Sequence, residues 1–213
     1  MYIPRHFAQS DQQAQFDLIR SSPLATLVVN TREGLVANHI PFVLDVEDLG
    51  TVKLLAHIPR ANPLSGHLAD GSDCLAVFHG PQGYVTPSWY ATKKEHGKVV
   101  PTWNYAVVHA HGRIRLVEDE DWILRQVNLL TELNEGSRST PWAVSDAPGD
   151  FTERLVRSLV GLELTVNRLE AKNKASQNQP EENQRSVLAA LESEAVDTVF
   201  ANHMRTVLND DSD

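Results

Sequence analysis

Residues 55–68 (LAHIPRANPLSGHL) combine the side chains of this chain that best suit an anionic ligand. An apolar strand leads into a turn that contains Arg60, Asn62 and Ser65, and His57 lies on the strand just before it. A guanidinium, an amide, a hydroxyl and the unpaired N–H groups of a turn are the donors with which proteins hold phosphate. The turn therefore predicts a phosphate site. The alternative is a polar turn without a ligand.

A second group of candidates lies within residues 83–105 (GYVTPSWYATKKEHGKVVPTWNY). Its polar and aromatic side chains are Ser88, Trp89, Tyr90, Thr102, Trp103 and Asn104. Aromatic faces together with amide and hydroxyl groups suit a flat ring rich in heteroatoms, such as an isoalloxazine. The alternative is that these aromatic side chains belong to the core or to a subunit interface.

A third group lies in residues 172–178 (KNKASQN), which are predicted to form part of a polar loop over residues 170–184. Lys172, Lys174 and Gln177 place two cations and an amide close together. Such donors predict a flap that reaches over a ligand or a partner subunit. A solvated linker is the alternative.

Composition narrows the function classes. The net charge is −9 and no basic run occurs, so direct DNA binding has little support, because phosphate contacts supply most of that affinity. No stretch approaches the roughly 18 apolar residues of a membrane span, and residues 1–13 contain no secretory h-region. The single cysteine, Cys74, excludes a disulfide framework and fits a reducing cytoplasm. We therefore expect a cytoplasmic protein without a membrane partner.

The nine histidines raise the question of a metal or haem. No HExxH or CxxC motif is present, and His109 and His111 alone make too small a ligand set for zinc. We therefore expect no metal site. Haem ligation by one histidine stays open, because haem needs only one axial residue from the protein.

The elements that must position these candidates are mostly short strands. Alternating apolar and β-branched residues predict strands at residues 24–30, 35–44, 51–57, 74–79, 83–86, 102–117 and 162–169. The dipeptide Gly80-Pro81 is expected to separate two of them, and Gly112 to bend the longest. The first six of these strands, at such short spacing, favour an antiparallel barrel, which leaves no exposed edge, and the strand at 162–169 could complete it.

Helices are expected around this barrel. Helical periodicity predicts helices at residues 12–21, 119–134, 150–160 and 185–208. In the second of these, Trp122, Ile123, Val127, Leu130 and Leu133 fall on one apolar face. Gly161 is the expected stop of the third. No internal repeat and no second domain is evident.

Nine strings of the chain, in this order, resemble the PaiB-type family, which is described as FMN-binding negative transcriptional regulators. The strings are MYIPRHF, PLATLV, GLVANHIPFVLD, HIPRANP, VFHGPQGYVTPSWY, VPTWNYAVVHAHG, SDAP, LVGLEL and KNKASQN. The resemblance covers residues 1–180, nearly the whole chain apart from its C-terminal helix. Several strings are long and unusual in composition, which makes the match specific.

The resemblance implies a mainly β fold with flanking helices (α+β), an antiparallel six-stranded FMN-binding split barrel related to pyridoxamine-phosphate oxidases and flavin reductases. It implies a split-barrel domain at residues 1–180 and a homodimer with FMN at the interface. Beyond the resemblance, we expect a C-terminal helix at 181–213 packed on the same domain, with an acidic, frayed end. The cofactor-binding residues would be His39, His57, Arg60, Asn62, Ser65, Ser88, Trp89, Tyr90, Thr102, Trp103, Asn104, Lys172, Lys174 and Gln177. No catalytic residue follows from it.

The function implied is that of a negative transcriptional regulator or a redox-linked regulator, with flavin-dependent oxidoreductase activity as a further possibility. Two alternatives stay open. One is a haem-binding split barrel, and the other is a flavin reductase or oxidase without any role at DNA.

Overall fold

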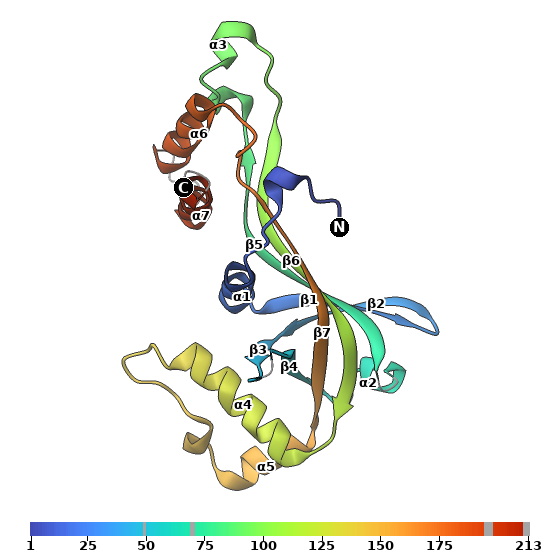
Figure 1. The fold of residues 1–213 in the computed structure, drawn as a ribbon. Helices are drawn as coiled ribbons and strands as arrows, with labels where there is room; N and C mark the ends of the chain where they lie inside the picture. Colours follow the sequence, from blue (N-terminus) through green and yellow to red (C-terminus); the bar gives the residue numbers. More distant parts are fainter. Residues whose placement is uncertain (49, 69–70, 194–197, 211–213) are drawn as a thin grey trace. The chain divides into compact units, whose positions relative to one another are not determined.

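The computed structural model describes residues 1–213 except 49, 69–70, 194–197 and 211–213. In the described part, seven strands form one sheet in the order β2-β1-β5-β6-β7-β4-β3 (Figure 1). The strands are β1 (Leu24–Thr31), β2 (Gly34–Pro41), β3 (Val43–Val46), β4 (Val52–Pro59), β5 (Ser72–Val85), β6 (Thr102–Val117) and β7 (Leu159–Lys174). The predicted class, mainly β with flanking helices, is confirmed.

The described chain divides into two compact units. The first unit comprises residues 1–18, 79–108 and 170–213, and the second comprises residues 19–78 and 109–169. The long strands β5, β6 and β7 contribute residues to both units.

Sheet closure in the second unit follows from how its two edge strands are connected. β2 and β3 lie at opposite ends of the strand order, yet only Phe42 separates them in the chain. Phe42 is buried, and its N–H donates to the carbonyl oxygen of Pro23 at 2.9 Å. Because one residue joins the two edges, the sheet must curl until they meet. The strand predicted at 35–44 is thus broken at Phe42 into β2 and β3. The sheet has seven strands, one more than the six-stranded barrel that was expected.

Two further strand predictions are wrong. β5 runs unbroken through Gly80-Pro81, where two strands were expected. A Cβ at Gly80 would lie 3.0 Å from side-chain atoms of Leu18 and Ala106, so close packing explains this glycine better than a turn does. β7 extends from Leu159 to Lys174, so residues 170–174 form part of a strand and not of a loop.

The longer helices lie close to their predicted positions, but the faces that they bury differ in part from those predicted. They are α1 (Gln12–Ser21), α2 (Leu64–His67), α3 (Lys93–His96), α4 (Glu120–Glu135), α5 (Gly149–Arg157), α6 (Glu181–Ser193) and α7 (Thr198–Asp210). Asp119 caps α4 by accepting from the N–H of Trp122 at 2.6 Å. α4 packs on β3 and β4 and buries Ile123 and Gln126, whereas Leu133 is exposed. The expected apolar face is therefore only partly the packing face.

The third predicted helix ends earlier than expected. α5 ends at Arg157 with Ser158 as its C-cap, and Gly161 lies within β7. A Cβ at Gly161 would fall 2.3 Å from the Trp122 ring. This glycine therefore admits α4 to the sheet and does not stop a helix.

Gly112 is required for strand packing in the second unit. It lies in the unbroken strand β6, where a bend was one expectation. A Cβ at this position would lie 2.1 Å from the Thr165 carbonyl oxygen and 2.7 Å from Cδ2 of Leu164. The backbones of β6 and β7 approach so closely here that a side chain has no space.

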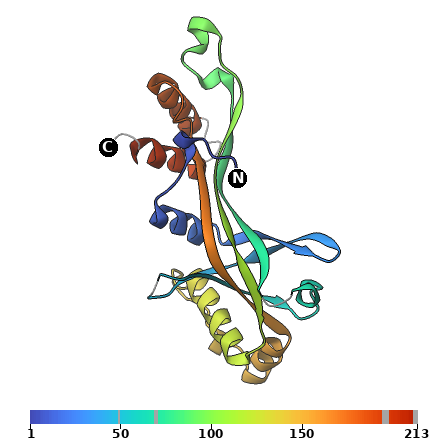
Figure 2. The same ribbon diagram turned by 45° about the vertical axis from the view of Figure 1, so that its right-hand side comes forward.

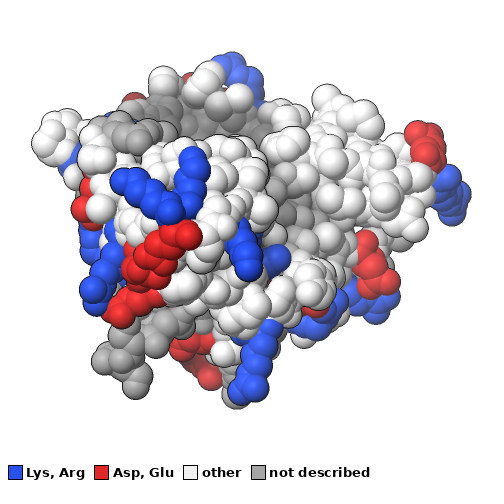
Figure 3. All heavy atoms as spheres, turned by 90° about the horizontal axis from the view of Figure 1, so that it is seen from above, with Lys and Arg blue, Asp and Glu red and all other residues white. Residues whose placement is uncertain are grey.

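Charged side chains of both signs are mixed on the surface. On the face shown in Figure 3, Lys and Arg side chains alternate with Asp and Glu side chains instead of forming one basic patch.

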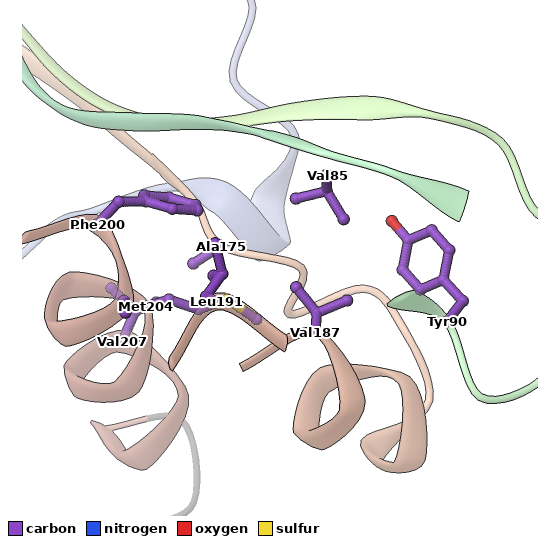
Figure 4. Packing of buried hydrophobic residues seen from close by; sticks show 9 residues of the cluster. Val85, Tyr90, Ala175, Val187, Leu191, Phe200, Met204 and Val207 are labelled. Carbon is purple, nitrogen blue, oxygen red and sulfur yellow. The ribbon is translucent and has the colours of Figure 1, made fainter. Parts of the chain in front are cut away.

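The first unit has its own hydrophobic core. α6 and α7 lie side by side (Figures 1 and 2), where one helix over residues 185–208 was expected. Figure 4 shows this core, to which β5, the helices and the segments that lead into them contribute Val85, Tyr90, Ala175, Val187, Leu191, Phe200, Ala201, Met204 and Val207. Asn183 ties α6 to the loop before α3, because its Oδ1 accepts from the Thr92 hydroxyl and N–H, each at 3.1 Å.

We predict that Gly112→Ala destabilises the protein by about 1–3 kcal/mol or more, because the added methyl group meets backbone atoms that cannot move aside alone. The free energy of unfolding in urea measures this. Gly149→Ala is the control, since a Cβ there meets nothing within 4 Å, and should change stability by about 0.5 kcal/mol or less. Equal stabilities of the two variants would contradict the packing argument.

A second prediction concerns His203 on α7. Its Nε2 is buried without a hydrogen-bond partner among the described residues, and burial lowers the pKa of the ring below its usual 6.5. The unfolded chain therefore binds the proton more readily, so the folded state should lose stability as the pH falls through about 6.5. His203→Leu should flatten the pH dependence of the unfolding free energy in this pH range. Parallel curves for wild type and His203→Leu would refute this.

Candidate functional site

The turn after β4 is held in shape by its own side chains. Asn62 Oδ1 accepts from the N–H of Leu64 at 3.0 Å, and Asn62 Nδ2 donates to Asn38 Oδ1 at 3.0 Å. The Ser65 hydroxyl donates to the carbonyl oxygens of Asn62 at 2.8 Å and of Arg60 at 3.2 Å. Asn62 and Ser65 thus use these groups to organise the turn before any ligand arrives.

Arg60 is the ionic group that this turn presents. Its Nε donates to the Arg157 carbonyl oxygen at 3.0 Å, and its Nη1 lies 3.4 Å from Glu118 Oε1. The Arg60 side chain is 41% exposed and the Glu118 carboxylate 75% exposed. Ion pairs this exposed contribute little, so an incoming phosphate can compete with Glu118 for the guanidinium.

His57 is oriented by a buried amide. Its Nδ1 lies 2.6 Å from Gln126 Oε1, and Gln126 Nε2 donates to the Leu55 carbonyl oxygen at 3.5 Å. Because an amide oxygen only accepts, Nδ1 carries the proton and Nε2 keeps its lone pair in the neutral ring. Gln126, on α4, was missed by sequence reasoning, since it lies in a helix far along the chain.

His39 and its neighbour Asn38 lie on opposite faces of β2, and only Asn38 contacts the turn after β4. Asn38 on β2 reaches Asn62, and neighbouring residues of a strand point to opposite faces. His39 is exposed and lies opposite Thr26 on β1. The sequence placed Asn38 and His39 on one strand, but alternation alone does not tell which of them faces the turn.

A cavity of about 220 Å³ lies in the first unit. Its polar lining includes Tyr90, Thr102, Asn104, Lys174 and Ser176. Its apolar lining consists of Phe7, Val99 and Val100. The start of β6 meets the end of β7 here, because the two strands are neighbours in the sheet. Four of the predicted site residues therefore come together, and Ser176 joins them.

Asn104 carries an unpaired acceptor in this cavity. The residue is fully buried, and its Nδ2 donates to the Ser176 hydroxyl at 2.8 Å. Its Oδ1 has no hydrogen-bond partner among the described residues. An unpaired buried acceptor costs about 1–3 kcal/mol, so this oxygen is suited to a donor from a ligand or from water.

Ser176 adopts a left-handed backbone conformation with φ of 68°, and its side chain is 2% exposed. Such a conformation is uncommon for a residue with a side chain and is often found where function requires it. It places the hydroxyl between Asn104 and Tyr90, whose phenol also bonds to Ser176. Burial raises the pKa of Tyr90, so its hydroxyl stays protonated and can donate. The KASQN string contained this serine, but no pattern singled it out.

Lys174 is one of two lysines that line the cavity, the other being Lys98. Its Nζ bonds to the Thr102 hydroxyl and donates to the Trp103 carbonyl oxygen at 2.7 Å. Burial lowers the pKa of Lys174, and the charge of Lys172 lowers it further. An electronegative ligand group would therefore stabilise the charged form of this lysine.

Lys172 serves a different purpose from Lys174. Its Nζ lies 5.1 Å from the ring centroid of Tyr105, 5.8 Å from that of Phe7 and 6.0 Å from that of Tyr2. It also donates to the Tyr2 carbonyl oxygen at 3.4 Å. These cation–π contacts hold the N-terminal segment against β6 and β7.

The remaining predicted residues do not line this cavity. Gln177 closes the turn after β7 by accepting from the Ala175 N–H and donating to the Asn173 carbonyl oxygen, each at 2.7 Å. The Ser88 hydroxyl accepts from Lys93 Nζ at 3.1 Å. Trp89 packs against the core of the first unit. Trp103 is 55% exposed and contacts Tyr84 edge-on, with ring centroids 6.1 Å apart.

Comparison with known proteins identifies the family. A family described as "Putative FMN-binding domain" matches residues 1–168. The chain belongs to this FMN-binding family. An uncharacterized protein of Emericella nidulans is 32% identical over 232 residues, which span 92% of each chain. The Bacillus subtilis protein named "Protease synthase and sporulation protein PAI 2" is 26% identical over 194 residues, 91% of this chain and 90% of that one. The resemblance to the PaiB type is confirmed.

Solved structures show the same fold in other flavin proteins. The flavocytochrome Anf3 of Azotobacter vinelandii matches with a TM-score of 0.58 at 16% identity, over 81% of this chain and 72% of its own. An FAD- and haem-binding protein of Mycobacterium smegmatis matches with a TM-score of 0.57 at 16% identity, over 85% of this chain and 79% of its own. At these identities the likeness concerns the fold alone. It confirms the predicted split-barrel fold for this FMN-binding family member.

Among the described residues, no helix combines the length and the apolar character that crossing a membrane requires.

Proposed function

We propose that this protein binds FMN and serves in flavin-dependent redox chemistry or in redox-linked regulation. The observation that carries the proposal is the cavity of the first unit, where the unpaired Asn104 oxygen and the Lys174 ammonium face a ligand space. Membership in an FMN-binding family indicates which ligand to expect. When bound, the flavin supplies hydride and electron transfer, while the protein positions and tunes the ring.

The cavity accommodates a part of FMN and not the whole molecule. Its volume of about 220 Å³ is smaller than the roughly 300–1,000 Å³ of sites that hold complete small ligands. The residues suited to the ring are Tyr90, Thr102, Asn104, Lys174 and Ser176. The phosphate needs a separate cation, which Arg60 in the turn of the second unit offers, with His57 beside it on β4.

We further propose that the FMN site lies between two copies of the chain, the turn of one protomer holding the phosphate and the cavity of its partner holding the ring. Exposed aromatic side chains support a subunit interface, and Tyr84 and Trp103 are 47% and 55% exposed. Aromatic residues are enriched in such interfaces.

A role in regulation would act through the flavin more readily than through direct DNA contact. The net charge of −9 disfavours binding to the phosphate backbone of DNA. On the face in Figure 3, Lys and Arg side chains lie among Asp and Glu side chains and form no continuous basic surface. Thiol chemistry has no support, because burial raises the pKa of Cys74 to about 12.

Haem is the second candidate ligand. His57 Nδ1 is held by Gln126, and histidines that bind metals commonly donate their other ring nitrogen in this way. Titration with haemin separates the two candidates, since a Soret band lost in His57→Ala would indicate haem ligation. Flavin absorption without that band favours FMN.

We predict that purified protein binds FMN and that Arg60→Met weakens this binding about 10- to 100-fold, the usual effect of losing one charge-assisted hydrogen bond. Riboflavin lacks the phosphate, so its affinity should change by no more than about twofold. Quenching of flavin fluorescence measures both constants. Arg154→Met, an exposed arginine of the same unit, is the control and should bind both ligands like the wild type. A protein that binds neither flavin would overturn the proposal.

The shared site makes a separate prediction. Arg60→Met and Asn104→Ala chains, each impaired alone, should regain tight FMN binding when mixed and allowed to exchange subunits. Random pairing makes half the dimers mixed, and each mixed dimer has one intact site, so about one quarter of all sites should recover. Titration of tight sites in the mixture measures this fraction. No recovery, with exchange verified by differently tagged chains, would refute a site shared between protomers.

A further inference from the structure

The cavity of the first unit places an unpaired acceptor close to a cationic donor, and Lys98, Asn178 and Gln179 also line it. The acceptor is Asn104 Oδ1, which is buried and unpaired among the described residues. The donor is Lys174 Nζ, which already bonds to Thr102 and to the Trp103 carbonyl oxygen and retains a third hydrogen. Phe7, Val99 and Val100 supply the apolar lining. A matching ligand group therefore carries an N–H or O–H beside an electronegative edge.

Only one edge of the flavin ring has this pattern. In oxidised isoalloxazine, N3 carries the single ring N–H, and the carbonyl oxygens O2 and O4 flank it. N1 lies next to O2 on the same pyrimidine ring. The dimethylbenzene end has no polar atom, so placing it here would leave Asn104 Oδ1 unpaired and the third hydrogen of Lys174 without an acceptor.

We infer that the pyrimidine edge of the flavin enters this cavity, where N3–H donates to Asn104 Oδ1 and Lys174 faces O2 and N1. This inference rests on the proposed binding of FMN and adds the orientation of its ring. It also makes Asn104 the residue that selects for an unsubstituted N3.

The orientation has a redox consequence. Uptake of two electrons and one proton at N5 converts the neutral oxidised ring to a monoanion, whose charge spreads over N1 and O2. A lysine ammonium beside this edge stabilises the anion more than the neutral ring. Burial and the neighbouring Lys172 lower the pKa of Lys174, which means that they disfavour its charged form. A nearby anion would offset this effect and stabilise the ammonium. Lys174 therefore favours reduced flavin and raises its midpoint potential.

Lys172 does not share this role, although it lies only two residues away. Its ammonium is occupied by the rings of Tyr2, Phe7 and Tyr105, and it is 8% exposed. The two lysines of KNK are therefore not interchangeable, and the structure assigns the tuning of the ring to Lys174.

A ligand analogue tests the hydrogen bond without changing the protein. Wild type should bind 3-methylriboflavin at least about tenfold more weakly than riboflavin, because the methyl group removes the donor and leaves Asn104 Oδ1 unpaired. In Asn104→Ala the two ligands should bind within about threefold of each other, since the acceptor is gone and space is gained. Asn202→Ala, on α7, is the control and should discriminate like wild type. Equal binding of both ligands by wild type would overturn the inference.

The charge is tested by potentiometry. Dithionite titration against a reference dye gives the midpoint potential of bound FMN. Lys174→Met should weaken binding of reduced relative to oxidised FMN about tenfold, which corresponds to a potential lower by about 30 mV for this two-electron couple. Lys174→Arg keeps the charge and should restore most of the shift. Lys94→Met, in the short helix α3, should leave the potential unchanged. An unchanged potential in Lys174→Met would refute the tuning role.

These outcomes separate the inference from the function on which it rests. If wild type binds neither FMN nor riboflavin, the proposed function fails. If it binds both, yet neither the methylated analogue nor the Lys174 substitution has an effect, FMN binding stands and the ring orientation is wrong.

Discussion

β6 and β7 are neighbours in the sheet and each contains 16 residues, which makes their pairing the constraint on which the candidate site depends. Near their middle the strands approach so closely that only glycine fits at Gly112, because the Thr165 carbonyl oxygen occupies the place of a Cβ. At one end, the pairing places the start of β6 beside the end of β7. Asn104 meets Ser176 there, and Lys174 meets Thr102. Residues about 70 positions apart in the chain thereby form one cavity.

Polar groups in this protein serve two different ends. In the turn after β4, the Asn62 side chain bonds to Asn38 and to the backbone, and the Ser65 hydroxyl bonds to the backbone. These two residues therefore shape the turn, and Arg60 is the residue left to bind a ligand. In the cavity of the first unit, Asn104 and Lys174 remain only partly satisfied. Unsatisfied buried groups reduce stability, and a binding site is the common reason for tolerating that cost. Asn62 and Ser65 therefore shape a candidate site, whereas Asn104 and Lys174 have groups left to bind a ligand.

Much of the fold was predictable from local patterns. β1, α1 and β6 agree closely with their predicted ranges, because strict alternation, helical periodicity and a Pro after a helix are local signals. The errors have a common origin. Gly80-Pro81, Gly112 and Gly161 look like turns, bends or stops in the sequence, yet at Gly80, Gly112 and Gly161 the glycine accommodates a neighbouring element. Local propensity cannot show that a partner element lies there.

The sequence by itself determined the class of fold, the family and the types of residue that a flavin site would need, because these depend on local spacing and on long, unusual strings. Only the tertiary structure decided which of those residues act together. It separated Lys174, in the cavity, from Lys172, held by aromatic rings two positions away, and it left Asn104 with an unpaired oxygen beside Ser176. Strand pairing and burial are the physical reason, since they join distant segments and decide which polar atoms find partners within the chain.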